Sequence, residues 1–204
     1  MNVQQGYNQW ASQYDTNENK TRDLEALAIR ELLDNVPFSS CLEIGCGTGK
    51  NSVWLSTKAG HLTAVDLSEE MMQKAKAKVS ADKVQFIRGD ILQNWDFIKR
   101  KYDLVTFSLV LEHIEDMEPV IRKSAAVLNP GGYIYIGELH PFKQYAGSKA
   151  RFETEEGLQV VPCFNHHVSD FINAAMKNGL KLVILEDIFD GGNRETLPRL
   201  IVML

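Results

Sequence analysis

Three glycines alternate with other residues in the segment GCGTG at positions 45–49. Glycine lets the backbone approach a ligand closely, and the apolar residues 40–44 and the helical pattern after the turn predict a strand, a turn and a helix. Because the first N–H groups of a helix have no partner inside it, such a turn can hold a nucleotide. A G-x-G-x-x-G dinucleotide fingerprint would need glycine where Lys50 stands, so the spacing disfavours a nicotinamide oxidoreductase.

Three carboxylic acids accompany this turn. Glu43 directly precedes it and suits a ligand that bears an ammonium group, whereas Asp66 and Asp90 follow the next two predicted strands. Taken alone, Asp66 could cap a helix and Asp90 could belong to a turn. Because the carboxyl ends of parallel strands meet at one edge of a sheet, we expect both acids beside the glycine turn.

Four of the five histidines follow predicted strands in the second half of the chain. A lone histidine is usually structural, but imidazole exchanges protons near neutral pH and can act as a general base. His140 is the first candidate for a general base or an acceptor contact, and His113 and His166 come next. Glu112 beside His113 could suggest a metal pair, but adjacent helical residues point in different directions and no third ligand is evident, so no metal site is predicted.

Apolar runs alternate with helical periods along most of the chain. Strands are expected at residues 40–44, 61–66, 84–87, 102–108, 133–138, 181–188 and 200–204. Helical crossovers between them predict an α/β fold with a doubly wound, Rossmann-like seven-stranded sheet. This sheet should be mostly parallel, with an antiparallel C-terminal strand and helices on both faces. Its ligand crevice should lie beyond the carboxyl ends of the strands.

Two segments fall outside this alternation. Residues 1–36 predict an N-terminal helical cap that places Trp10 and Tyr14 on one helical face, where either could cover a ligand. Residues 140–167 break the pattern, and long loops in compact domains usually bind something, so we expect a lid or acceptor insertion there. The whole chain, residues 1–204, is expected to form a single domain.

Composition narrows the class of protein. The formal charge of −5 disfavours binding to a phosphate backbone. The three cysteines, Cys41, Cys46 and Cys163, show no paired spacing and fit a reducing compartment. Neither a basic, apolar leader nor an apolar run of membrane-spanning length is evident. We therefore expect a soluble cytoplasmic protein, a monomer or homodimer, with neither nucleic acid nor membrane as a partner.

Several motifs resemble those of the class I S-adenosylmethionine (SAM)-dependent methyltransferases, in the same order. They are LEIGCGTG at 42–49, Asp66-Leu67 after the second strand, GDI at 89–91 after the third, and LNPGG at 128–132 before the fifth. The match extends over residues 40–140. The segment WASQYD at 10–15 loosely resembles the N-terminus of the small-molecule branch, which uses its N-terminal helices and the segment after strand five as a lid.

The resemblance implies an enzyme that transfers a methyl group from SAM to a small-molecule acceptor, whose attacking O, N or C atom stays open. It implies that Asp66 binds the ribose hydroxyls, that Leu67 lies beside the adenine and that Asp90 accepts from the adenine amino group. The expected cofactor-binding residues are Tyr14, Glu43, Gly45, Cys46, Gly47, Gly49, Asp66, Leu67, Gly89, Asp90, Ile91 and Ser108.

Alternatives within the same fold are a protein or RNA methyltransferase and a non-catalytic SAM-binding protein. The first should show a basic or peptide-sized groove, which the acidic composition does not indicate. The segment SLVLEH at 108–113 also differs from the Asn-Pro-Pro-Tyr motif typical of methyltransferases acting on base amines. Pro162-Cys163 resembles the catalytic Pro-Cys of cytosine-C5 enzymes but follows strand five instead of strand four, so Cys163 is interpreted as a loop or core cysteine.

Overall fold

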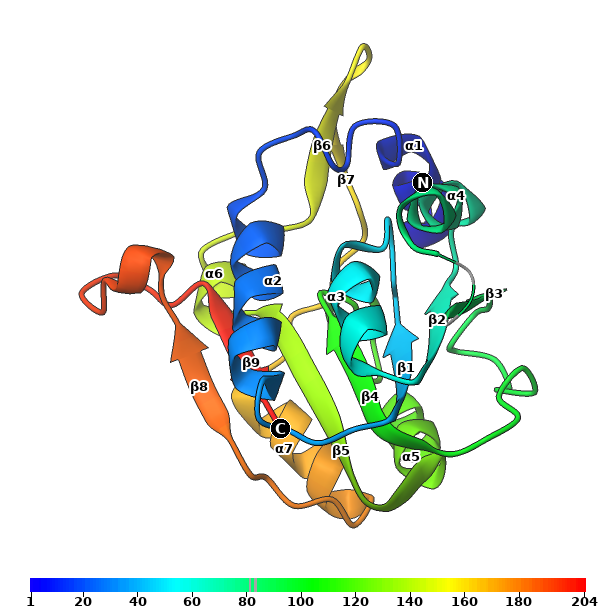
Figure 1. Cartoon of the computed structure of the whole chain (residues 1–204). Helices are drawn as coiled ribbons and strands as arrows, with labels where there is room; N and C mark the ends of the chain where they lie inside the picture. Colours follow the sequence, from blue (N-terminus) through cyan, green and yellow to red (C-terminus); the bar gives the residue numbers. More distant parts are fainter. Residues whose placement is uncertain (81, 83) are drawn as a thin grey trace.

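A seven-stranded sheet forms the centre of the chain, of which the computed structural model describes residues 1–80, 82 and 84–204. Its strands are β1 (Ser40–Ile44), β2 (His61–Asp66), β3 (Val84–Arg88), β4 (Tyr102–Ser108), β5 (Leu128–Leu139), β8 (Leu185–Ile188) and β9 (Leu200–Met203). They lie in the order β3-β2-β1-β4-β5-β9-β8, and only β9 is antiparallel to its neighbours in the sheet as described (Figure 1). The predicted doubly wound, mostly parallel sheet is therefore confirmed.

Helices cover both faces of this sheet (Figure 1). They are α1 (Val3–Trp10), α2 (Lys20–Leu33), α3 (Lys50–Lys58), α4 (Glu69–Lys78), α5 (Glu118–Ala126), α6 (Pro141–Tyr145) and α7 (Val168–Lys177). On one face Ile29 of α2, Leu55 of α3 and Met72 of α4 share a buried cluster. On the other, Ile121 of α5 and Phe171 of α7 share a second cluster. Strands buried on both faces explain the near-continuous apolar runs in the sequence.

The ends of two strands differ from the sequence-based expectation. β5 begins at Leu128, five residues earlier than predicted, because Leu128 already pairs with Tyr102 ahead of an irregularity in the register. β8 begins only at Leu185. The amides of the two preceding residues, Val183 and Ile184, both donate to the carbonyl of Leu204, which follows the last residue of β9, so they do not continue the regular pairing. Both boundaries are set by pairing with the neighbouring strand. The composition of a single strand does not encode that pairing.

Helix starts follow the available capping groups. Ser68 caps α4 as predicted, since its hydroxyl accepts from the amide of Met71 at 3.2 Å. α7 begins at Val168, before the predicted cap Ser169, and the carboxylate of Asp170 accepts from the amide of His167 at 2.8 Å. None of the helices within the described residues is long and apolar enough to cross a membrane.

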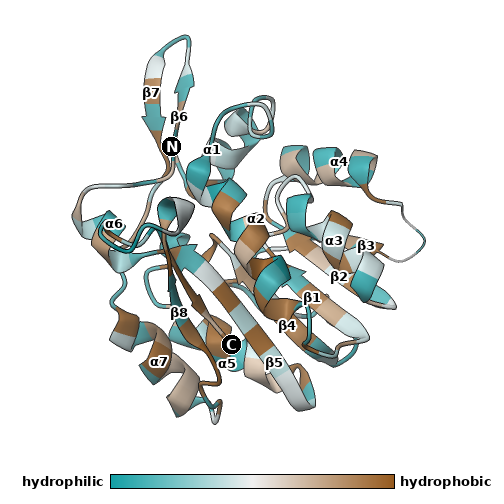
Figure 2. Cartoon of the chain, turned by 60° about the vertical axis from the view of Figure 1, so that its left-hand side comes forward, coloured by the Kyte–Doolittle hydropathy of each residue, from teal (hydrophilic) through white to brown (hydrophobic). Residues whose placement is uncertain are grey.

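The segment 140–167 contains regular structure of its own. It holds α6 and a two-stranded hairpin, β6 (Arg151–Thr154) with β7 (Gly157–Val160), which extends away from the main sheet beside α1 (Figures 1 and 2). Phe152 on β6 stacks on Trp10 at the end of α1, with ring centroids 5.1 Å apart. The predicted insertion and the N-terminal cap therefore pack against each other, although Trp10 and Phe152 are 142 positions apart in the sequence.

Candidate functional site

A cleft lies at the carboxyl ends of the central parallel strands, where the sequence places the glycine turn. We call it the glycine cleft. Nine of the twelve predicted cofactor-binding residues line it, namely Tyr14, Gly45, Gly47, Asp66, Leu67, Gly89, Asp90, Ile91 and Ser108. These nine predicted residues come from five separate segments of the chain, which the fold brings to one place.

The glycine turn requires glycine for two different reasons. Gly45 and Gly49 have φ angles of 72° and 79°, a region that side chains disfavour. A Cβ on Gly45 would come within 2.2 Å of the Val110 side chain, and one on Gly49 within 2.8 Å of Ala75 on α4. In front of Gly47, by contrast, a Cβ would meet no described atom within 4 Å, so the backbone there faces open space.

Asp66 connects the turn to β2. Its carboxylate accepts from the amide of Gly47 at 2.7 Å and from the amide of Ser68 at 2.8 Å. Burial raises the pKa of Asp66, and these amide hydrogen bonds oppose the rise. Asp90 lines the same cleft and accepts from the amide of Leu92 at 2.9 Å. Two carboxylates therefore face a mainly apolar cleft, where they could accept hydrogen bonds from hydroxyl or amino groups of a ligand.

Three predicted residues are not part of the cleft lining in the described structure: Glu43, Cys46 and Gly49. Glu43 lies behind the turn, hydrogen-bonded to the hydroxyl of Ser52 and only 4% exposed. Burial raises its pKa to about 8. The expectation that Glu43 meets a ligand's ammonium group is thus corrected, because the strand directs this side chain into the core. Cys46 is likewise buried, and Gly49 packs against α4.

Helix α1 covers the glycine cleft. Val3, Tyr7 and Tyr14 line the cleft from this side. Two polar contacts hold the helix down, since Gln4 donates to the carbonyl of Leu67 at 3.2 Å and the hydroxyl of Ser68 contacts Asn8 Oδ1 at 2.6 Å. Under this cover the cleft has a volume of only about 160 Å³.

His113 is the predicted catalytic histidine that reaches the cleft. Its Nδ1 lies 2.7 Å from the carbonyl of Pro162, which can only accept, so we assign the ring proton to Nδ1. Nε2 is then free to accept from the hydroxyl of Tyr7, at 2.7 Å. Burial lowers the pKa of His113, which favours the neutral base. Tyr7 was not among the predicted site residues, and the aromatic spacing of α1 was the only signal for it.

The other two histidines are structural. His140, the first candidate for general base, is 3% exposed, and its Nδ1 accepts from the amide of Phe142 while Nε2 pairs with Asp187 at 3.1 Å. His166 is buried, with Nε2 within 3.1 Å of two backbone carbonyls. Within the described structure neither ring lines a cavity next to the cleft. The structure therefore does not bring either ring to the cleft: both nitrogens of His140 have protein partners, and Nε2 of His166 joins the lid segment to the loop after β4.

A buried carboxylate shapes the loop that carries His113. Glu138 on β5 accepts from the amides of Val110 and Leu111, each at 2.8 Å, and lies 3.4 Å from the amide of Glu112. Burial, and then the nearby Glu112, raise the pKa of Glu138 to about 8. Leu109 at the start of this loop has a φ of 58°, which Glu138 helps to maintain. The sequence offered no sign of this role.

A second cavity, which we call the outer cavity, adjoins the glycine cleft. Tyr7, Tyr14 and Leu109 line both spaces. The outer cavity has a volume of about 660 Å³ and is mostly polar. Its wall includes Trp10, Glu112, Lys149, Arg151, Phe152 and Arg199. Two ligand spaces that meet at Tyr7, the partner of His113, could bring two reactants together there.

Comparison with known proteins identifies relatives of this arrangement. Residues 42–136 match a family model described as a methyltransferase domain. The chain is 30% identical over 142 residues to a ubiquinone biosynthesis O-methyltransferase of Hydrogenovibrio crunogenus, covering 68% of this chain and 58% of that protein. It is 32% identical over 156 residues to a malonyl-[acyl-carrier protein] O-methyltransferase of Priestia megaterium, covering 70% and 56%. The matched region thus spans less than two thirds of either relative.

Solved structures show the same fold at lower identity. A structure described as a putative S-adenosylmethionine-dependent methyltransferase from Listeria monocytogenes superposes with a TM-score of 0.75 at 19% identity, covering 89% of this chain and 96% of that one. A DhpI–SAH complex superposes with a TM-score of 0.74 at 21% identity, covering 98% and 93%.

Proposed function

We propose that the chain is a SAM-dependent methyltransferase that transfers a methyl group from SAM to a small molecule. Residues 42–136 match a model of a methyltransferase domain, and the fold is that of solved structures described as S-adenosylmethionine-dependent methyltransferases. One observation carries this proposal: the glycine cleft and the outer cavity meet at Tyr7, whose hydroxyl contacts His113 on the cleft side. A methyl donor in the first space and an acceptor in the second would face each other at that point.

The residues of the glycine cleft fit an adenosyl ligand. Asp66 would accept from the ribose hydroxyls and Asp90 from the adenine amino group, while Leu67 and Ile91 supply apolar surface. The open space in front of Gly47 leaves room for the ligand's close approach to the backbone. Glu43 supports the turn from behind, through Ser52.

SAM supplies a methyl group on a positively charged sulfur, which is already activated for transfer. The chain's own contribution is to align the acceptor and to exclude water. In our proposal Tyr7 takes a proton from the acceptor while its own hydroxyl proton passes to Nε2 of His113, 2.7 Å away. Pro162 holds the imidazole in the tautomer that this transfer needs. An acceptor that arrives as a neutral amine would need this relay less than a hydroxyl would.

The outer cavity supports a small-molecule acceptor. Its volume of about 660 Å³ falls in the range of metabolite-sized pockets, roughly 300–1,000 Å³. One of the relatives named above is described as a ubiquinone biosynthesis O-methyltransferase, which favours a small-molecule acceptor. We further propose a single domain over residues 1–204, with residues 1–36 as cap and 140–167 as lid. It would act in the cytoplasm as a monomer or homodimer, without nucleic acid.

Two measurements test the proposal in sequence. Calorimetry with S-adenosylhomocysteine should show binding to one site per chain. Incubation with methyl-labelled SAM and fractionated metabolite pools should then transfer label to a small molecule, and a Tyr7→Phe variant should transfer much less. Absence of cofactor binding would overturn the proposal. Binding without any labelled product would instead favour a non-catalytic SAM-binding protein.

A further inference from the structure

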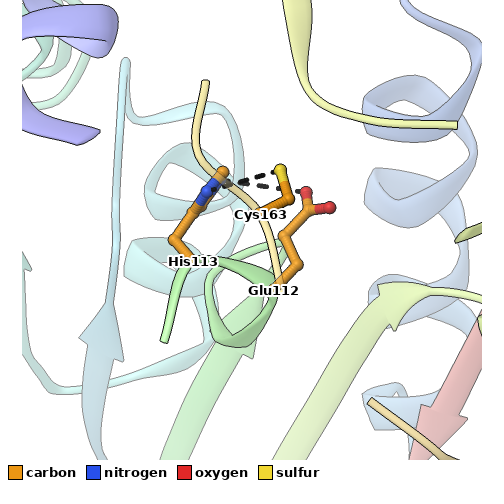
Figure 3. A group of neighbouring side chains, drawn as sticks. All are labelled: Glu112, His113 and Cys163. Atoms are coloured by element: carbon orange, nitrogen blue, oxygen red, sulfur yellow. Dashed lines mark hydrogen bonds and ion pairs between the residues drawn. The ribbon is translucent and has the colours of Figure 1, made fainter. Parts of the chain in front are cut away.

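Three side chains with metal-binding atoms converge where the glycine cleft meets the outer cavity (Figure 3). Glu112 and His113 come from the short helix η1 (Leu111–His113), and Cys163 comes from the segment before α7. One ligand atom from each residue lies within 4.8 Å of the others. Nε2 of His113 is 3.9 Å from the Glu112 carboxylate, and the sulfur of Cys163 is 3.8 Å from Nδ1 of the same ring. Cys163, from the predicted lid, is therefore the third candidate ligand that was not evident from the sequence.

Glu112 provides an independent sign that the cluster is incomplete. Its side chain is buried, and its Oε2 has no hydrogen-bond partner among the residues that the structure describes. Buried carboxylate oxygens normally have a partner, because an unpaired one costs free energy. Within this cluster a cation would supply the missing interaction.

The surroundings of His113 also suit a metal ligand. A histidine that binds a metal usually donates its other ring N–H to a carboxylate or backbone carbonyl, which orients the ring. Here Nδ1 donates to the carbonyl of Pro162 at 2.7 Å, which leaves Nε2 as the unprotonated nitrogen. In the present arrangement that lone pair accepts from Tyr7.

We propose that Glu112, His113 and Cys163 form a binding site for one divalent transition-metal ion, with Zn²⁺ as the best match. Carboxylate, imidazole and thiolate are the three donor types that zinc prefers. Bonds of about 2.0–2.3 Å in a tetrahedral arrangement place ligand atoms roughly 3.3–3.8 Å apart, so an ion would draw these three side chains, whose ligand atoms lie within 4.8 Å of one another, closer together. Three protein ligands leave a fourth position for water or another small ligand.

Occupation of this site has a consequence that rests on the proposed function. A metal ion on Nε2 takes the lone pair that accepts from Tyr7. Zinc therefore inhibits methyl transfer by separating the tyrosine from its base. Metal binding must displace the proton of the Cys163 thiol, because the thiolate is the form that binds the ion. Affinity for the ion accordingly increases with pH.

The test uses the purified full chain and cobalt(II) as a spectroscopic substitute for zinc. Titration should give one ion per chain, with the charge-transfer absorption of a cobalt–thiolate bond. Cys163→Ala and Glu112→Gln should each weaken binding at least about tenfold. Cys41→Ala is the matched control, because Cys41 is also a free cysteine but lies in the core away from the cluster. Its affinity should equal that of the parent chain.

Two results would overturn the site: cobalt binding without a thiolate band, or equal affinity in the parent and the Cys163→Ala variant. Thermal melting of each variant without metal shows whether it is folded, and a Cys163→Ser variant repeats the test with a smaller change in shape. Zinc inhibition of methyl transfer, lost in Cys163→Ala, would support the whole proposal. Stoichiometric cobalt–thiolate binding in a chain that methylates no acceptor would support the site and contradict the proposed function.

Discussion

At the scale of single residues, Asp66 has a double role. It links the glycine turn to the end of β2 through the amide of Gly47, and it presents carboxylate oxygens to the cleft. The turn is therefore held in its ligand-binding shape by the same group that we assign to the ribose. Such preorganisation lowers the cost of ordering the site on binding.

Replacing Asp66 by asparagine tests this assignment. Asp66→Asn keeps the shape of the side chain but removes its charge, and hydrogen bonds to charged groups contribute roughly 1.5–3 kcal/mol. We expect S-adenosylhomocysteine to bind at least about tenfold more weakly, as measured by calorimetry. Asp34→Asn is the control, since Asp34 pairs with Lys58 on an exposed surface. An unchanged Kd in Asp66→Asn would rule out its part in cofactor binding.

The chain contains a second tyrosine–histidine pair that serves as a control for the first. Tyr7→Phe removes the hydroxyl that contacts His113, and general acid–base groups contribute roughly 10²–10⁴-fold to rates. We expect kcat to fall by such a factor while the Kd for cofactor changes little. Tyr145 is hydrogen-bonded to His167 outside both cavities as described, so Tyr145→Phe should keep full turnover. Equal kcat in the two variants would exclude the relay.

How far the site could be predicted depended on whether its residues belong to a sequence motif. The glycine turn, Asp66 and Asp90 follow consecutive strands, so strand order alone brings them together. His140 and His166 could not be told apart from His113, because the groups that contact their rings, the Asp187 carboxylate and the carbonyl of Ile114, come from distant segments. The meeting of Cys163 with Glu112 depends on how residues 140–167 fold, which no local pattern encodes.

At the scale of elements, the β6–β7 hairpin and α1 form one wall of the outer cavity. Phe152 and Trp10 are both buried in their mutual contact, together with Val161. The predicted cap and the predicted lid are therefore coupled through packed side chains. A substitution in the cap should therefore alter the packing of the lid, and a substitution in the lid that of the cap.

Removal of the Phe152 ring tests this coupling. Phe152→Ala is expected to lower the free energy of unfolding by about 3 kcal/mol, because large-to-small changes of buried aromatics typically cost 3–5 kcal/mol. Leu158→Ala on the same hairpin is the control, as Leu158 is 56% exposed and should change stability by less than about 0.5 kcal/mol. Urea unfolding followed by tryptophan fluorescence measures both. The coupling is refuted if the two variants unfold alike.

The elements themselves were largely predictable. β1, β2 and β4 have the predicted limits, since apolar runs bounded by turn residues leave little choice. The short helix α6 and the hairpin were not expected, because their residues are mostly exposed and carry no clear period. Their structure depends on packing against α1 and on the histidine that caps α6.

At the scale of the whole molecule, buried carboxyl groups make stability depend on pH. Burial raises the pKa of Glu43 to about 8, that of Glu112 to about 7 and that of Glu138 to about 8. The folded chain keeps protons that the unfolded chain releases above a pKa near 4.5. Each such group therefore lowers stability as pH rises, by up to about 1.4 kcal/mol per pH unit, until its folded pKa is passed.

Glu43→Gln isolates one of these contributions. Glutamine resembles the protonated acid and does not titrate, so this variant should gain stability relative to the parent as pH rises. Between pH 5.5 and 7.5 the difference in unfolding free energy should grow by roughly 2–3 kcal/mol. The exposed Glu31 provides the control variant Glu31→Gln, for which the difference should stay constant. A difference that does not vary with pH in Glu43→Gln would show that Glu43 ionises normally.

The cover that α1 forms over the glycine cleft has a kinetic consequence. About 160 Å³ is less than the roughly 300 Å³ of the smallest usual ligand pockets, so a nucleoside-sized molecule can exchange only when α1 lifts. The polar contacts from Gln4 and Asn8 that fix the helix contribute about 1 kcal/mol each, and the packing of Trp10 on Phe152 adds to them, so opening is a slow step. We expect product release, which requires movement of α1, to be the rate-limiting step of the catalytic cycle.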